Sequence, residues 1–294
     1  MPTLKEIKGR IASVKSTLKI TSAMKLVSSA KLRKAQNAIE AMRPYERQLQ
    51  AMLASVKEFP VAAVENAVEA GENGSEASSE SRPTAIVAIA SNSSLCGGFN
   101  ANVIAKVRSV RKGGDVVYSV GRKMADAMRK DGFPSPADYS RLSEHPAYAP
   151  AADLVGKLAE DLEEGRIGEV LLVYNHFVST ARQVPTVERL LPADKVCHSE
   201  RSEESSDRTE SPDAIIEPSR KELLKVLLPK TLKLKLYAAL LDSAAAEHAA
   251  RTVAMQTATD NAENLLGELT LQYNKGRQQK ITSEILDLAG GKTE

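Results

Sequence analysis

The chain has 294 residues, enough for one large domain or two small ones, and 42% of them are hydrophobic, as in a protein with a core. Aromatic residues make up only 4% and tryptophan is absent, which favours long helices over an ordinary enzyme. No run of about 18 apolar residues exists, so no transmembrane helix is expected, and the absence of a signal-like start predicts that the chain is not secreted. Two cysteines, Cys96 and Cys197, are too few for a disulfide framework and fit a reducing compartment.

The net charge of +2 is spread unevenly along the chain. Residues 1–50 contain 11 Lys and Arg against 3 Asp and Glu, whereas residues 51–218 contain 18 against 26 and residues 219–294 contain 11 against 9. The positive charge is therefore concentrated in the first segment, which calls for a binding partner or another physical explanation.

Residues 1–57 have the pattern of one long helix. Starting at Leu4, positions spaced three and four residues apart are apolar at 12 of 16 places up to Val56, a period over about eight heptads that is typical of a coiled coil. Three of the four polar exceptions are consecutive in this seam: Thr21, Lys25 and Ser28. The centre of the seam is thus small, polar and basic, and Pro44 predicts a kink or a local break farther along.

The middle of the chain alternates between strand-like and helix-like segments. Residues 58–82 are acidic and rich in Gly and Ser, as in a flexible linker, and residues 197–213 are polar and expected to form a disordered loop. Between them, strands are expected over residues 84–90, 115–120, 169–175 and 181–192, and helices over residues 101–112, 122–130 and 151–165. This alternation predicts a mainly parallel sheet covered by helices, with the last strand at an edge because of Pro185.

Residues 219–294 predict a second long helix, after a short strand at residues 214–218. Ser219 and Glu222 have the spacing of a capping box, and the helix is expected to continue to about Leu288, over roughly 100 Å. Its seam is again only partly apolar: Thr252, Met255, Thr259, Ala262, Leu266, Leu269 and Tyr273. A lone helix of this length is rarely stable in water, so the two long helices are expected to pack antiparallel, with a Rossmann-like α/β domain of residues 83–218 between them in sequence.

Candidate chemistry is confined to the segment SNSSLCGGFN, residues 91–100, between a strand and a helix. Gly97 and Gly98 could turn backbone amides toward an anion there, and Cys96 could act as a nucleophile at a helix start. Neither phosphate-binding glycine motif is present, and none of the four histidines stands in a recognisable partner motif. A tight strand-to-helix turn is the simpler interpretation.

Two other classes of protein remain open from the residues alone. One is an enzyme whose α/β domain uses the Cys96–Gly98 turn, with the long helices as a dimerisation arm. The other is a helical adaptor whose basic helix neutralises nucleic-acid phosphates, although that helix lacks aromatic residues and any known reader motif. Binding of this helix to an anionic membrane is disfavoured by the absence of flanking Trp or Phe. No metal site is expected, because the adjacent Cys197 and His198 lack a second ligand pair.

Three segments contain long or specific motifs. The first helix contains IASVKSTLKITSAMK, the turn contains LCGGFN, and the last helix contains ATDNAENLLGELTLQYNKGRQQKITSEI. Together they resemble the gamma subunit of the rotary, F-type ATP synthase, and the likeness covers both ends and the central domain. Only residues 58–82 and 197–213 fall outside it. Where the family often has Asp-Arg-Gly before LCGG, this chain has Asn92, Ser93 and Ser94, which leaves open any special role of the turn.

The resemblance implies a rotor that is not itself catalytic. In that family the terminal helices form an antiparallel coiled coil inside a hexamer of alternating α and β subunits, and the α/β domain lies at the foot beside the epsilon subunit and the membrane c-ring. Ion flux turns the shaft, which forces the β sites through their conformations for ATP synthesis or hydrolysis. The implied protein is peripheral, at the cytoplasmic face of a bacterial cell membrane, with no cofactor, no nucleic acid and no direct membrane insertion.

The resemblance also implies which side chains contact the ring of α and β subunits: Met24, Lys25, Arg33, Arg251, Arg277, Gln278 and Thr282. Met24 and Lys25 match a segment near an acidic loop of β, and Arg251 matches a position on which coupling depends. A small, polar seam suits a shaft that turns in a sleeve, because it limits strong apolar contact at any one angle. An asymmetric shaft can then favour a different state in each β subunit through differential contacts alone.

Overall fold

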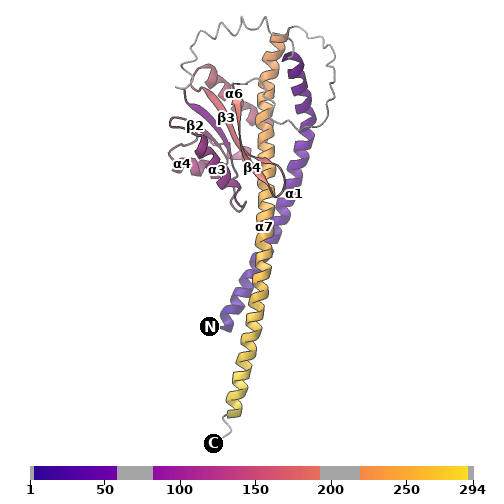
Figure 1. The fold of residues 1–294 in the computed structure, drawn as a ribbon, viewed down its shortest axis with the longest axis vertical. Helices are drawn as coiled ribbons and strands as arrows, with labels where there is room; N and C mark the ends of the chain where they lie inside the picture. The colour runs from indigo at the N-terminus through magenta and orange to yellow at the C-terminus, as the bar shows by residue number, and fades with distance from the viewer. Residues whose placement is uncertain (1–2, 58–81, 193–218, 291–294) are drawn as a thin grey trace.

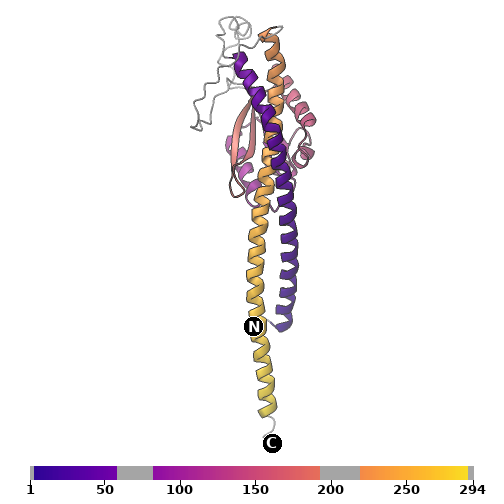
Figure 2. The same ribbon diagram turned by 90° about the vertical axis from the view of Figure 1, so that its right-hand side faces the viewer.

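The computed structural model describes three stretches of the chain: residues 3–57, 82–192 and 219–290. Two long helices dominate it (Figure 1), α1 over Leu4–Lys57 and α7 over Arg220–Gly290, with 54 and 71 residues. They run antiparallel beside each other in Figures 1 and 2 and form a shaft, as the sequence predicts.

The start of α7 has part of the predicted cap. The Glu222 N–H donates to Ser219 Oγ at 3.3 Å, which satisfies one of the free amides of the first turn. The predicted disordered loop at residues 197–213, the strand at residues 214–218 and all but the last residue of the predicted linker lie outside the described residues.

The seam between α1 and α7 follows the predicted spacing. All residues of α1 that the structure describes as buried belong to the predicted set: Ile7, Thr21, Ser28, Leu32, Leu49 and Leu53. On α7, the predicted positions Met255, Thr259, Ala262 and Leu269 are buried in turn. At the polar centre, Thr259 Oγ1 donates to Thr21 Oγ1 across the seam at 2.9 Å. Because buried hydroxyl groups need partners, this bond favours one register of the two helices.

Pro44 lies inside α1 without interrupting it, so the local break that the sequence allows does not form. Pro44 is exposed to solvent, whereas Met42 and Leu49 on either side of it pack in one apolar cluster with Leu227 and Leu234 of α7. These contacts hold the helix together across the hydrogen bond that a proline removes.

The central domain contains a four-stranded sheet with strands β1 Thr84–Ile89, β2 Val116–Val120, β3 Glu169–Phe177 and β4 Gln183–Leu191. The strand order is β2-β1-β3-β4. Strand β1 pairs in parallel with β2 and β3, and β4 pairs antiparallel with β3 at the edge. The mainly parallel sheet and the edge position of the strand that contains Pro185 are therefore confirmed.

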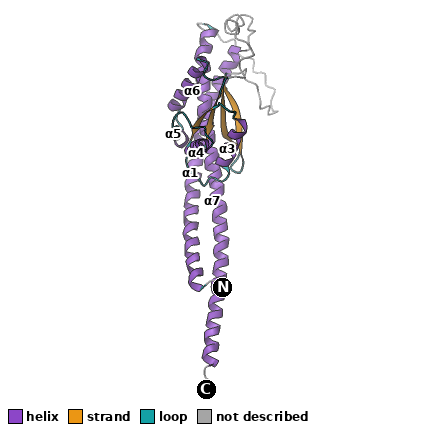
Figure 3. Ribbon diagram, turned by 90° about the vertical axis from the view of Figure 1, so that its left-hand side faces the viewer, coloured by secondary structure: helices purple, strands orange, loops and turns teal. Residues whose placement is uncertain are grey.

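Helices cover both faces of this sheet (Figure 3). They are α3 Phe99–Val110, α4 Arg122–Lys130, α5 Ser140–Glu144 and α6 Tyr148–Glu163, and only the short α5 has no counterpart among the expected helices. One face packs against α3 and α4, and the other packs against α6 and against Leu236, Ala239 and Leu240 of α7. Helix α7 is therefore part of the shaft and part of the core of the domain.

The hydroxyl pair in the seam can be tested by replacing one or both threonines. Thr21→Val should lower the free energy of unfolding of the full chain by about 1 kcal/mol, because the bond between the helices is lost. Adding Thr259→Val should cost little more, since no bond between the helices then remains to be lost. Urea unfolding followed by circular dichroism measures both. Thr17→Val is the control, because Thr17 is exposed and bonds only within α1; a loss as large as that of Thr21→Val would contradict this role.

The connection from β2 to α4 requires a glycine. Gly121 has a φ of +101°, and a Cβ atom there would lie 2.1 Å from the carbonyl oxygen of Ala90. Gly121→Ala should lower the free energy of unfolding by more than about 2 kcal/mol in the same assay. Gly113→Ala is the matched control, since a Cβ atom there meets no atom within 4 Å. Equal stability of the two variants would show that the close approach is not needed.

Candidate interaction surfaces

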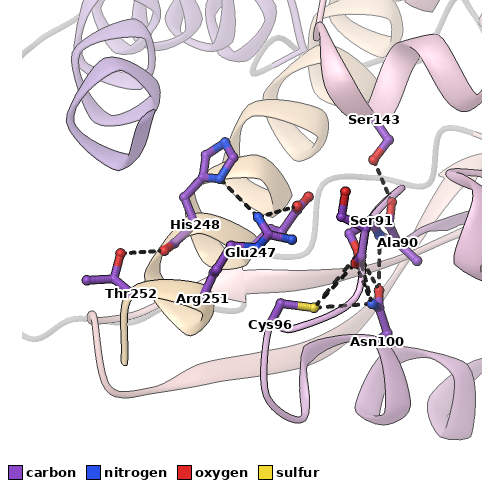
Figure 4. A network of polar contacts seen from close by, with 10 residues as sticks. Ala90, Ser91, Cys96, Asn100, Ser143, Glu247, His248, Arg251 and Thr252 are labelled. Carbon is purple, nitrogen blue, oxygen red and sulfur yellow. Dashed lines mark hydrogen bonds and ion pairs between the residues drawn. The ribbon is translucent and has the colours of Figure 1, made fainter. Parts of the chain in front are cut away.

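The turn after β1 uses its polar groups on itself (Figure 4). The Ser91 N–H donates to Asn100 Oδ1 at 3.1 Å, and Asn100 Nδ2 donates to Ser91 Oγ at 2.8 Å and to Cys96 Sγ at 3.2 Å. Cys96 itself is only 1% exposed. The sulfur is therefore enclosed by the turn, and this arrangement favours the tight-turn interpretation over a nucleophile.

Asn92 ties the same turn to its neighbours. Its Oδ1 accepts the Arg122 N–H at the start of α4 at 3.0 Å, and its Nδ2 donates to the Ser140 carbonyl oxygen at 2.9 Å. The Ser91 carbonyl oxygen accepts the Lys123 N–H at 3.1 Å. Two free amides of the first turn of α4 are thus already bonded, so this helix start is not an open anion site.

Helix α7 fills the place where a sheet of this kind commonly binds a ligand. In open α/β sheets ligands bind beyond the carboxyl ends of the strands, where the strand order reverses, which here lies between β1 and β3. At that point Cys96 and Phe99 pack in one cluster with Ala246 and Ala250 of α7. Asn175 at the end of β3 donates from Nδ2 to the Phe99 carbonyl oxygen at 3.0 Å. The crevice is occupied by the shaft, which argues against the enzyme alternative.

Arg251 is buried in α7 beside a carboxylate. Arg251 Nη1 lies 2.7 Å from Glu247 Oε1, and the two side chains are 10% and 11% exposed. Burial raises the pKa of Glu247, an effect opposed by the charges of Arg251 and of Lys31 on α1. Burial, with those two cations, lowers the pKa of His248 to about 4. His248 is therefore neutral near neutral pH, and its Nδ1 can accept from Arg251 Nη1 at 3.5 Å.

The other predicted contact residues lie on two separate stretches of the shaft. Met24 and Lys25 are half-buried on α1 and Arg33 is exposed there. Arg277, Gln278 and Thr282 are exposed on α7, where Thr282 Oγ1 donates to the Gln278 carbonyl oxygen at 2.9 Å. The seven predicted residues thus do not form one site. They mark the middle of the shaft, one buried ion pair and the C-terminal end.

The C-terminal part of α7 extends beyond α1. Gly276 lies opposite Leu4, the first residue of α1, at a place where a Cβ atom would be 3.1 Å from Leu4 Cδ2. Figures 1 and 2 show α7 continuing past the N-terminal end of α1. All residues from Arg277 to Leu288 are exposed. We call residues 277–288 the overhang.

Both stretches also have an apolar component that the sequence motifs did not indicate. Outside the seam, α1 exposes Ile20, Leu26 and Val27 at 60%, 70% and 56%, and the overhang exposes Ile281, Ile285, Leu286 and Leu288. Large exposed apolar side chains that are grouped along one element indicate a partner surface. The sequence did contain a signal for this surface, because these large apolar residues lie outside the heptad positions that face the other long helix.

The residues that the structure describes contain no group of three or more His, Cys, Asp or Glu side chains that could hold a metal ion. No described helix has a segment long and apolar enough to cross a membrane. The adjacent Cys197 and His198 lie outside the described residues.

Two solved structures that resemble this chain are parts of ATP synthases. The chain superimposes with a TM-score of 0.67 on a chain of the Euglena gracilis mitochondrial ATP synthase, solved as OSCP/F1/c-ring, at 18% identity over 99% of this chain and 93% of the other. It superimposes with a TM-score of 0.52 on a chain of the central stalk and c-ring of the Tetrahymena thermophila mitochondrial ATP synthase, at 21% identity over 81% of this chain and 99% of the other. Both likenesses concern the fold.

Sequence comparison gives the family. Residues 3–293 match the family model described as ATP synthase. The ATP synthase gamma chain of Phocaeicola vulgatus is 48% identical and that of Bacteroides thetaiotaomicron is 45% identical, each over 99% of both chains. The chain therefore belongs to the gamma-chain family of the F-type ATP synthases, the rotor subunit of the central stalk.

Proposed function

We propose that this rotor couples ion flux through the membrane c-ring to the catalytic sites of a surrounding ring of α and β subunits, for ATP synthesis or hydrolysis. The overhang is the observation that carries the proposal. An isolated helical segment of this length is marginal in water, yet α7 continues past the end of its partner helix with polar and apolar side chains exposed. A sleeve of other subunits that encloses this end accounts for both features.

The overhang is proposed to contact the sleeve in two ways. Ile281, Ile285 and Leu288 recur at helical spacing and supply apolar contact area, while Arg277 and Gln278 supply hydrogen bonds beside Thr282. A short apolar contact with a few hydrogen bonds would keep the end of α7 centred in the sleeve. Strong contact along the rest of the shaft is then not needed.

Helix α1 is proposed to meet acidic loops of the same ring. Arg33 is exposed and Lys25 is half-buried, so Arg33 and the exposed part of Lys25 can approach carboxylates. Met24, also half-buried, is next to Lys25 in the chain. Contacts between exposed charges are individually weak, at about 0–1 kcal/mol, and are screened by salt. Weak contacts of this kind can favour one state of a β subunit and still release it when the shaft turns.

Arg251 is proposed to act on the ring indirectly. Its burial and its ion pair with Glu247 leave little of the guanidinium exposed, so it supports the shape of the shaft where α1 and α7 meet the turn after β1. Glu247 is then as important for coupling as Arg251.

The sheet domain is proposed to face the epsilon subunit and the c-ring, and the complex to lie at the cytoplasmic face of a bacterial membrane. Support comes from the bacterial gamma chains to which the sequence is similar and from the c-ring complexes that contain chains of the same fold.

The direct test mixes the full chain with α and β subunits of the same organism and measures assembly by size-exclusion chromatography. One copy of this chain for every three β subunits is expected, and failure of correctly folded α and β subunits to bind it would overturn the proposal.

The overhang gives the sharpest variants. The double variant Arg277→Ala, Gln278→Ala should reduce ATP hydrolysis by the assembled complex by about tenfold, the loss expected when two or more polar contacts at an interface are removed. The free energy of unfolding of the chain alone should not change, because both side chains are exposed. Arg129→Ala is the control, since Arg129 is 70% exposed on α4 and loses only a surface pair with Asp126. Unchanged hydrolysis in the double variant would argue against the polar contacts.

The indirect role of Arg251 predicts a shared effect. Arg251→Ala and Glu247→Ala should each destabilise the chain by about 3 kcal/mol, because each leaves an ionisable group buried without its partner. The double variant should cost clearly less than twice that amount. The three variants should also lose hydrolysis to the same extent in the assembled complex. Normal hydrolysis in Glu247→Ala beside a loss in Arg251→Ala would show that Arg251 contacts the ring directly.

A further inference from the structure

A single carboxylate joins the end of β3 to the shaft. Asp242, on α7, has its Oδ2 at 2.5 Å from Nδ1 of His176 and its Oδ1 at 3.2 Å from the backbone N of Phe177. Both oxygens of Asp242 are thus bonded to adjacent residues at the end of one strand. We call these two contacts the joint.

The joint lies between two apolar contact zones of α7 with the sheet domain. Leu236, Ala239 and Leu240 pack on the sheet before it, and Ala246 and Ala250 pack on the turn after β1 beyond it. Apolar contact is strong but not directional, and the alanines present flat surfaces that resist sliding only weakly. A charge-assisted hydrogen bond has a defined direction and therefore resists a shift of the helix along or around its axis.

We propose that Asp242 and His176 are positioning residues that lock the sheet domain to the rotor helix and transmit torque between them. This inference rests on the rotor function proposed above, because the torque arises only if the domain is driven at the foot while the shaft meets resistance in its sleeve. The opposing forces on the domain and the shaft then act across the contact surface between α7 and the sheet domain. Asp242 and His176 bridge this surface.

The burial of Asp242 explains why it needs this partner. Its side chain is 19% exposed, and desolvation raises its pKa, an effect that the hydrogen bond and charge of His176 oppose. A buried carboxylate that is ionised near neutral pH is unfavourable unless it is paired. Loss of the imidazole therefore weakens the contact and also leaves a buried charge without its counter-ion.

A second polar contact between the domain and α7 is more exposed. Lys235 Nζ lies 3.0 Å from Glu188 Oε2 of β4 and donates to the Arg189 carbonyl oxygen at 3.2 Å. The Glu188 side chain is 34% exposed and that of Asp242 is 19% exposed, so solvent screens the carboxylate of this pair more than the carboxylate of the joint. Asp242 is therefore the main directional contact of the two.

The charges around the joint come from every element packed on it. Glu188 on β4 raises the pKa of Asp242 and accepts the Tyr174 hydroxyl of β3 at 2.7 Å. Lys235 on α7 offsets the charge of Glu188. On α1, Glu46 lies close enough to feel Glu188, with Arg43 and Arg47 beside it. Cations on both long helices therefore lie among the carboxylates of this region.

The two partners of the joint differ in exposure. The Asp242 side chain is 19% exposed and the His176 side chain is 45% exposed. The carboxylate is therefore the enclosed half of the contact, and the imidazole is the half that solvent reaches.

The experiment measures the joint directly through the Phe177 amide. Its protection against hydrogen exchange is followed in the full chain alone and in the assembled, membrane-reconstituted complex. Asp242→Asn keeps an oxygen acceptor but removes the charge, and should lower the protection factor of this amide about tenfold. His176→Lys keeps a nitrogen donor beside Asp242 and should retain high protection, whereas His176→Ala removes the donor and should give low protection. His145→Gln, a change at an exposed histidine of the same domain, should behave as the unmodified chain.

A functional readout separates torque transfer from simple stability. In the reconstituted complex, Asp242→Asn should lower the number of ions pumped per ATP hydrolysed, and His176→Lys should retain it, while His145→Gln changes neither pumping nor hydrolysis. Protection and pumping in Asp242→Asn equal to those of His145→Gln would overturn the inference. An unmodified chain that fails to assemble or pump would instead contradict the proposed rotor function, and the exchange data on the chain alone would still decide whether the joint exists.

Discussion

The packing of α7 against two different surfaces at once is the constraint on which the rest of the structure depends. Ala245 and Ala249 pack with Leu32 of α1, and Ala246 and Ala250 pack with the turn after β1. Adjacent pairs of alanines thus face opposite partners on one turn of helix, where larger side chains would not fit between the two surfaces. The shaft and the domain share one helix, so a movement of either is a movement of both.

This arrangement also decides what the α/β domain can do. A sheet of this topology usually leaves a crevice at the point where its strand order reverses, and here α7 occupies that place. Cys96 of the turn, which from the sequence alone was a candidate nucleophile, is buried against Ala246 and Ala250 of α7 instead. The domain is held to the shaft by this packing, and the outer face of α1 and the overhang are the surfaces proposed for contact with the α and β subunits.

Polar groups are placed where apolar contact alone would allow sliding. The Thr21–Thr259 bond lies within the seam, the Glu247–Arg251 pair lies where α1, α7 and the turn meet, and Asp242 bonds the end of β3. The threonines and the Glu247–Arg251 pair are buried, Asp242 is partly buried, and each contact is directional. The cost of burying such groups is offset only in the correct alignment, so they favour one register of the parts over others.

Local patterns were sufficient to predict the two long helices, their seam, the strands with their edge strand and the motifs of the family, because these depend on periodicity and on residues close together in the chain. Such patterns could not predict the filling of the crevice by α7, the continuity of α1 through Pro44, the burial of Arg251 or the bond between Asp242 and His176. Residues 66 positions apart meet in that last contact, and no local pattern records the meeting. These features follow from tertiary packing, because they arise when one helix is packed between two surfaces that are far apart in sequence.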